Sequence, residues 1–270
     1  DQSGSDEASQ ALSDEQLKPL AEVLTGLPPL PASWRQLVQF AAGYYQRSLG
    51  EMTLMVLPPE LRQLDDTQWG RRLKRLDKDV AKGVAAADAA PALPELTEQQ
   101  AQALQTLAGP VDKPFLLWGS TGSGKTEVYL RQAQKALDEG KQVLMMVPEI
   151  NLTPQLESRV AERFAGRRIV SLHSGLTPAQ RLRNWLLAHT GHADLVLGTR
   201  LSVFTPMPRL GLIVVDEEHD PSYKQQDGAR YSARDLAVYR ARSEKVAVVL
   251  GSATPSLETW YNALPPADGG

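Results

Sequence analysis

The chain has 270 residues, and with 42% hydrophobic residues it can bury the core of one large or two modest domains. Its formal net charge of −3 at pH 7 excludes a uniformly basic surface, so any nucleic-acid contact must be a local patch. It contains no cysteine and no run of about 18 apolar residues, which excludes disulfides, thiolate zinc sites and membrane spans within this chain and predicts a cytoplasmic location.

Residues 1–64 predict a small N-terminal region. The stretch 1–16 is polar and acidic, and we expect it to be frayed. A proline-rich turn at 27–31 follows, after which Ser33 is expected to cap a helix. That helix carries apolar residues at helical spacing, a pattern that favours core packing over a binding face. The residues are Trp34, Leu37, Val38, Phe40, Ala41 and Tyr44.

Residues 65–95 predict a charged helix followed by a linker. The helix is basic, and the run to Pro94 that follows it is rich in alanine and contains proline. The cations of the helix could contact a DNA backbone, but a solvated helix face is the favoured interpretation. They are Arg71, Arg72, Lys74, Arg75, Lys78 and Lys82.

From residue 96 to residue 270, strand and helix patterns alternate. Helical patterns cover 126–139, 153–164 and 178–189. This alternation predicts an α/β lobe with a mostly parallel sheet covered on both faces. The expected strands are 115–118, 142–147, 169–172, 194–197, 212–215 and 246–250.

Residues 119–126 form a complete phosphate-binding loop between a predicted strand and a predicted helix. Glycines let the backbone N–H groups of such a loop approach and wrap phosphates. We expect Lys125 to reach the β- and γ-phosphates and the hydroxyl of Thr126 to bind Mg²⁺. The predicted nucleotide-binding residues are Gly119, Ser120, Thr121, Gly122, Ser123, Gly124, Lys125 and Thr126.

The apolar run 212–215 ends in the sequence Asp-Glu-Glu-His. Asp216 should therefore emerge at the carboxyl end of a strand, where it can hold Mg²⁺ through water. Glu217 is placed to orient or deprotonate the attacking water, and His219 is assigned a coupling role near the γ-phosphate. The two motifs together predict binding of a nucleoside triphosphate with Mg²⁺, and its hydrolysis.

Four further polar segments leave predicted strands at the same sheet edge. They contain Thr153, Ser174, Thr199 with Arg200, and the sequence Gly-Ser-Ala-Thr-Pro at 251–255. Each segment alone is a common strand-to-loop transition, but their order around one nucleotide site favours a motor whose loops contact nucleic-acid phosphates.

The loop 221–240 interleaves aromatic and basic residues, a composition suited to stacking on single-stranded bases beside phosphate neutralisation. Its tyrosines are Tyr223, Tyr231 and Tyr239, and its cations are Lys224, Arg230, Arg234 and Arg240. Of these, Lys224, Arg230 and Tyr231 are the predicted DNA contacts.

These motifs together resemble the superfamily 2 helicases. The narrower combination of 121–129, 147–150, 173–176, 216–226 and 231–240 is similar to the PriA family of replication-restart DNA helicases, densely over 96–260 and more weakly over 18–62. The resemblance implies an ATP- and Mg²⁺-dependent DNA helicase motor lobe, preceded by part of a DNA-binding domain. It also implies that Gln100 reads adenine and that residues 221–240 couple DNA binding to hydrolysis.

The resemblance further implies partners: single-stranded and branched fork DNA, primosome proteins and a single-stranded-DNA-binding protein. The chain departs from the family pattern because residues 63–95 leave no room for a winged-helix domain. It also lacks a second helicase lobe, with its arginine for the γ-phosphate and its zinc-binding cysteines. We therefore expect this chain to bind ATP, to hold no zinc and to turn ATP over slowly. Two alternatives stay open, a nucleotide-binding interaction module with little turnover and an unrelated P-loop ATPase.

Overall fold

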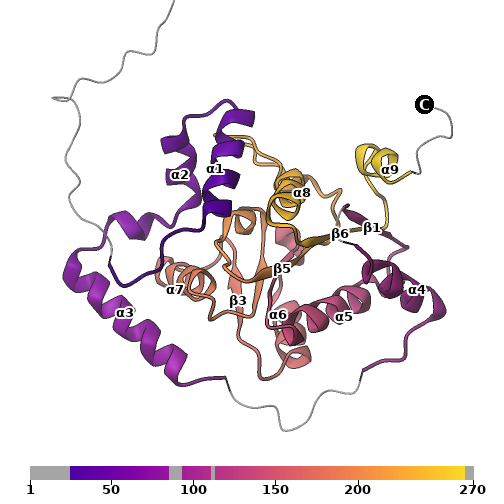
Figure 1. The fold of residues 1–270 in the computed structure, drawn as a ribbon, viewed down its shortest axis with the longest axis horizontal. Coiled ribbons are helices and arrows are strands. Elements are labelled where there is room, and N and C mark those ends of the chain that lie inside the picture. The colour runs from indigo at the N-terminus through magenta and orange to yellow at the C-terminus, as the bar shows by residue number, and fades with distance from the viewer. Residues whose placement is uncertain (1–24, 85–92, 111–112, 265–270) are drawn as a thin grey trace, which may run out of the picture.

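The computed structural model describes residues 25–84, 93–110 and 113–264, and a six-stranded parallel sheet forms its centre (Figure 1). The strand order is β1-β6-β5-β2-β4-β3. Every predicted strand is found, and none of the ends is shifted by more than two residues. The predicted α/β fold is therefore confirmed. The strands are β1 (Phe115–Trp118), β2 (Gln142–Met146), β3 (Ile169–Leu172), β4 (Leu195–Gly198), β5 (Leu210–Val215) and β6 (Ala247–Ser252).

Apolar side chains cover both faces of the sheet, as expected for strands that read as continuous hydrophobic runs. Along β2, Leu144 and Met146 belong to one hydrophobic cluster, whereas Val143 and Met145 belong to the other. The first cluster includes residues of α7 and α8, and the second includes residues of α5 and α6. The helices of the lobe are α4 (Glu98–Leu107), α5 (Lys125–Asp138), α6 (Pro154–Arg163), α7 (Pro178–His189), α8 (Ala233–Glu244) and α9 (Leu257–Ala263).

Local sequence signals fix the ends of these helices. Thr153 caps α6 by accepting a hydrogen bond from the Leu156 amide, and Thr177 forms a capping box with Gln180 at the start of α7. Gly140, with φ of +73°, follows α5 and lets the chain turn into β2. Short 3₁₀ helices occupy the connections: η2 (Pro59–Arg62), η3 (Glu149–Asn151), η4 (Arg200–Phe204) and η5 (Pro221–Tyr223).

The N-terminal region forms α1 (Ala32–Tyr44) and α2 (Leu49–Val56), followed by the charged helix α3 (Asp66–Ala81). The predicted cap at Ser33 is wrong, because α1 begins at Ala32 and Ser33 lies inside its first turn. The carbonyl of Pro31 accepts the first bond, from the Arg35 amide, at 3.1 Å. The apolar stripe of α1 lies mainly in the core, as predicted, although Tyr44 is 68% exposed.

The N-terminal helices share one hydrophobic core with the sheet (Figure 1). Trp34 of α1 donates its indole N–H to the carbonyl of Phe204 at 2.5 Å, and the ring of Phe40 stacks on Tyr239 of α8 at a centroid distance of 3.6 Å. The helix α3 contacts α7 through an ion pair between Asp79 and Arg183. The division into 1–64, 65–95 and 96–270 stays a prediction.

Two sequence predictions fall on residues outside the described ranges: the frayed segment 1–16 and most of the alanine-rich linker. Among the helices that the structure describes, none combines the length and the apolar character needed to cross a membrane.

Candidate nucleotide-binding site

The phosphate loop joins the end of β1 to the first turn of α5, so an anion held by it would lie at a helix N-terminus. Gly122 and Gly124 have φ of +81° and +83°, a backbone region that glycine adopts readily. A Cβ atom at Gly119 would lie 2.7 Å from the Ser123 hydroxyl. The amino group of Lys125 lies across the loop and donates to the Gly119 carbonyl at 2.8 Å. The structure thus gives the loop the conformation that its glycines predict.

Asp216 follows β5 directly, and its backbone amide donates to the Met146 carbonyl of β2 at 2.9 Å. Burial and then the neighbouring Glu217 charge raise the pKa of Asp216. A bound cation would counter both effects. Glu217 has φ of +47°, an uncommon value for a residue with a side chain, and its amide donates to the Asp216 carboxylate at 3.1 Å. The two acidic residues are therefore held in one defined arrangement.

A single cavity of about 590 Å³ joins the two motifs. Gly124, Lys125 and Thr126 line one side of it, and Asp216 and Glu217 line another. A hydroxyl and a carboxylate supply the hard oxygen ligands that Mg²⁺ prefers, and the loop amides at the N-terminus of α5 suit a phosphate. The residues present therefore fit a magnesium-bound nucleotide.

The cavity also contains cations that the sequence analysis missed. Arg159 and Arg163 of α6 both line it. Arg163 pairs with Glu127 at 3.2 Å, and its buried Nε has no hydrogen-bond partner within the described part of the chain. Their spacing of four residues places the two arginines on one face of α6. That spacing, on a helix that follows strand β2, is the sequence signal that could have identified the two arginines.

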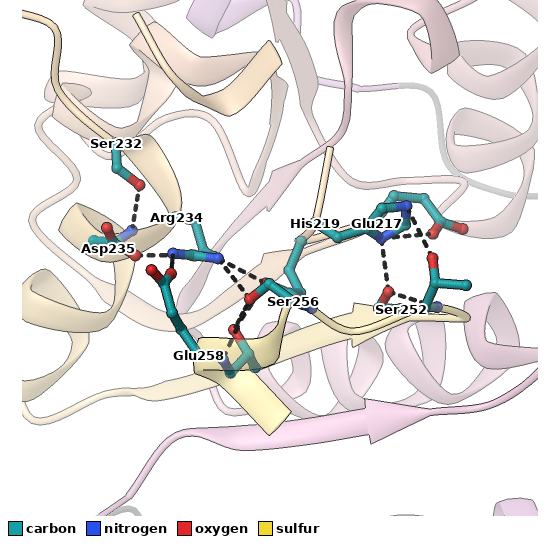
Figure 2. Close-up of polar contacts among 11 residues, drawn as sticks. Glu217, His219, Ser232, Arg234, Asp235, Ser252, Ser256 and Glu258 are labelled. Atoms are coloured by element: carbon teal, nitrogen blue, oxygen red, sulfur yellow. Dashed lines mark hydrogen bonds and ion pairs between the residues drawn. The ribbon is translucent and has the colours of Figure 1, made fainter. Parts of the chain in front are cut away.

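His219 connects the acidic motif to the segment after β6 (Figure 2). Its Nδ1 lies 2.7 Å from the hydroxyl of Ser252, and its Nε2 lies 3.3 Å from the hydroxyl of Thr254. The Ser252 hydroxyl also accepts from the Thr254 amide at 3.0 Å. The imidazole thus contacts both segments, and its coupling role stays a prediction.

Glu218 holds the same motif in place through buried hydrogen bonds, a role that the sequence analysis did not assign. Its carboxylate is buried and accepts hydrogen bonds from the Ser256 amide at 2.8 Å and the Thr259 hydroxyl at 2.9 Å. Arg234 of α8 pairs with it at 3.2 Å and also contacts Glu258 (Figure 2). The carboxylate thus joins β5, α8 and α9.

Polar residues at the ends of β3 and β4 line a second cavity, of about 380 Å³. They include Ser174, whose hydroxyl donates to the Glu149 carboxylate, and Thr199 with Arg200. The Arg200 guanidinium donates to the Ser222 carbonyl at 3.3 Å. Thr153, the fourth predicted phosphate contact, caps α6 with its hydroxyl. Three of the four residues thus meet around one cavity.

Residues 97–262 match the family model of DEAD/DEAH box helicases, and residues 4–58 match the model of a 3′ DNA-binding domain. The chain belongs to the DEAD/DEAH box helicase family. Replication restart protein PriA of Synechocystis sp. is 50% identical over 171 residues, which are 62% of this chain and 20% of that protein. PriA of Rickettsia felis is 40% identical over 230 residues, 84% of this chain and 33% of that protein. The predicted resemblance to the PriA family is confirmed. The chain spans a third or less of the length of these two relatives.

Among solved structures, RecG bound to a three-way DNA junction covers 85% of this chain and 28% of its own, at 21% identity and a TM-score of 0.48. The DEAD-box helicase Mss116, in a structure with single-stranded RNA and UDP-BeF, covers 70% of this chain and 42% of its own, at 17% identity and a TM-score of 0.48.

In this DEAD/DEAH box lobe, Gln100 lies against the phosphate loop. It forms a capping box with Thr97 at the start of α4, and its amide nitrogen donates to the carbonyls of Ser123 at 3.3 Å and Gly124 at 3.4 Å. These bonds place Gln100 beside the nucleotide cavity. That it reads adenine stays a prediction.

The structure corrects the predicted stacking surface of this helicase lobe. Tyr231 is 1% exposed and packs edge-on against Phe204, so its ring is not open to solvent, although it belongs to the lining of the cavity of about 380 Å³. Tyr223 is buried as well, and its hydroxyl donates to the Asp216 carbonyl at 2.7 Å. The rings fill space between the N-terminal helices and the sheet, and burying their apolar area is favourable. The prediction that Tyr231 stacks on a base is therefore not supported.

The predicted cations of the same loop divide into two groups. Arg240 is buried and pairs with Glu244 at 2.8 Å, and Arg234 is held by the Glu218 cluster, so neither is available to a phosphate. Lys224 and Arg230 are exposed. Only these two stay predicted contacts from the loop.

Proposed function

We propose that this chain is the nucleotide-binding motor lobe of an ATP-dependent DNA helicase that acts in replication restart and primosome assembly. The observation that carries the proposal is the cavity shared by the phosphate loop and the pair Asp216–Glu217. His219 adds a connection from this cavity to Ser252 and Thr254. The similarity to PriA over most of the chain supports the placement in replication restart.

The residues of the cavity have separate tasks in this proposal. Thr126 and Asp216 would hold Mg²⁺, which adds positive charge beside the phosphates when bound. Lys125 exchanges its contacts with Gly119 and Ser120 for contacts with the β- and γ-phosphates. Glu217, held by its backbone next to Asp216, orients or deprotonates the attacking water. The loop amides and α5 neutralise the remaining charge.

DNA is the proposed partner of the loops at the other strand ends. The match of residues 4–58 to a 3′ DNA-binding domain supports this partner from the N-terminal side. Ser174, Thr199 and Arg200 suit contacts to phosphate oxygens, which predict weak sequence preference and a steep salt dependence. Single-stranded and forked DNA, primosome proteins and a single-stranded-DNA-binding protein are the proposed partners of the whole protein.

The test is a steady-state ATPase assay with and without single-stranded DNA, with Lys125→Ala as the inactive reference. We expect slow turnover that increases when DNA is added, because Arg200 bonds the Ser222 carbonyl and the adjacent Tyr223 hydroxyl bonds the Asp216 carbonyl. Nucleotide binding without DNA-stimulated turnover would favour the interaction module. Turnover that is unchanged by DNA would contradict the proposal that ATP hydrolysis in this lobe is coupled to DNA.

A further inference from the structure

The cavity of about 380 Å³ lies where two parts of the chain meet. One wall is the segment 55–59, which runs from α2 into η2, and the opposite wall is formed by the loops after β3 and β4. The match to a 3′ DNA-binding domain ends at residue 58, inside the first wall. The cavity is therefore bounded by both segments of the chain that are associated with DNA.

The rim on the sheet side is polar. Ser174, Thr199 and Arg200 belong to the lining there, with Ser174 exposed and Thr199 buried, and β3 and β4 are neighbours in the sheet, so their following loops lie side by side. A DNA backbone that contacts these residues would pass along the mouth of the cavity. Its bases would then face either the solvent or the cavity.

Both sides of the cavity also carry apolar residues. Met55, Leu57, Trp185 and Leu201 line the cavity, and the buried indole N–H of Trp185 has no hydrogen-bond acceptor among the residues that the structure describes. Flat apolar and aromatic surfaces bind the faces of nucleobases, and a base carries ring nitrogens and carbonyl oxygens that accept hydrogen bonds. The chemistry of these walls therefore matches a base.

The cavity carries charged groups of both signs. Glu149 lines it, and its carboxylate accepts a hydrogen bond from the Ser174 hydroxyl, while Arg181 and Arg200 also belong to the lining. A neutral base is compatible with this mixed lining, and the carboxylate disfavours a phosphate at Ser174. Cavities of about 300–1,000 Å³ hold small molecules, so this one is large enough for a single base rather than a stacked run.

We propose that this cavity receives one unstacked nucleobase of a single DNA strand whose phosphates contact Arg200. The inference rests on the proposed function, because it requires that these loops bind DNA. It adds a base-binding site to a face that is otherwise expected to contact only the backbone.

The test compares two strands of equal length, one of thymidylate and one of abasic deoxyribose phosphates, by fluorescence anisotropy at fixed salt. Leu201→Trp fills the cavity from its rim, where Leu201 is 42% exposed, so the fold should tolerate the change. Leu54→Trp is the matched control, because Leu54 is 47% exposed and lies outside the cavity. Met55→Trp is a second filling variant from the opposite wall.

The parent chain should bind the thymidylate strand at least about fivefold more tightly than the abasic strand, the smallest effect expected for one base contact. Both filling variants should lose this difference while keeping the parent's affinity for the abasic strand. The control Leu54→Trp should show the same difference between the two strands as the parent. If the filling variants bind both strands as the parent does, another occupant such as an apolar peptide side chain fits the cavity and the inference is wrong. Equal binding of the two strands by the parent overturns the inference alone, whereas binding of neither overturns the proposed function as well.

Discussion

Glu217 combines an acidic side chain with a positive φ at the end of a buried strand. Such a conformation costs about 1–3 kcal/mol for a residue that carries a Cβ, and it persists where the surrounding structure holds it. Here the holding contacts are its own amide bond to Asp216 and the Glu218 amide bond to the Gly251 carbonyl. The backbone thus keeps two carboxylates adjacent despite their mutual repulsion, which a bound cation would relieve.

Replacing Lys125 with alanine should abolish stabilisation by Mg²⁺ and ATP without unfolding the lobe, because the side chain contacts only loop carbonyls. For the parent, ligand at 100 times its Kd gives about 2.7 kcal/mol, a Tm increase of roughly 5–10 °C for a domain of this size. Thermal unfolding with and without nucleotide measures it. Lys135→Ala, at an exposed position on the same helix, is the control. An unchanged Tm shift in Lys125→Ala contradicts the assignment.

Replacing Asp216 with asparagine should raise the Tm of the nucleotide-free chain at pH 7. Burial raises the pKa of Asp216 above 3.8, so the folded chain binds this proton more tightly than the unfolded chain does. Stability from this group is therefore lost as pH rises from 3.8 through the raised pKa. The advantage of Asp216→Asn should shrink as pH is lowered toward 3.8, while its response to Mg²⁺ and ATP is absent at every pH. A lower Tm at pH 7 without nucleotide would falsify the electrostatic account.

At the scale of elements, the strands could be predicted because buried parallel strands are short apolar runs bounded by turn residues. The helices α6 and α7 were predicted from helical patterns, and the structure shows that each begins at a Thr-Pro pair, which gives a cap and a proline at the first position. The tyrosines of the loop 221–240 were misinterpreted because composition does not show which face of a loop is covered. Their partners, Phe40 and Phe204, come from distant parts of the chain.

Glu218 was visible in the sequence as a second glutamate, but its partner Arg234 could only be identified from the packing of α8 against β5. Replacing Arg234 with methionine leaves this buried carboxylate without its cation, a change that costs about 3–5 kcal/mol. Adding Glu218→Gln should restore a large part of the loss. Urea unfolding of the two single variants and the double variant measures the coupling, and additive losses would show that the pair is unimportant.

At the scale of the whole molecule, the N-terminal helices and the sheet share one hydrophobic core, which no local sequence pattern predicted. The sequence analysis divided the chain by composition, whereas Trp34, His189 and Tyr45 connect the parts through long-range bonds. Such contacts depend on the packed structure and leave no periodic signal in the sequence.

Replacing Trp34 with phenylalanine should destabilise the described fold by about 1–3 kcal/mol, because the buried Phe204 carbonyl loses its donor. Since the core is shared, the loss should appear as one earlier unfolding transition, followed together by circular dichroism and aromatic absorbance. Trp260→Phe, at a position 37% exposed, is the control. Two separate transitions, with only the first shifted, would show that the N-terminal region is an independent domain.

The loop between η5 and α8 is fastened at both of its ends. Tyr223 at its start bonds the Asp216 carbonyl, and the Ser232 amide at its end donates to the Tyr45 hydroxyl of the N-terminal region at 3.0 Å. The Ser232 amide can therefore exchange its hydrogen with solvent only when Tyr45 moves away. Deuterium uptake at this single amide should thus report whether a ligand bound to the N-terminal helices has loosened the backbone that leads to Asp216, the proposed magnesium ligand.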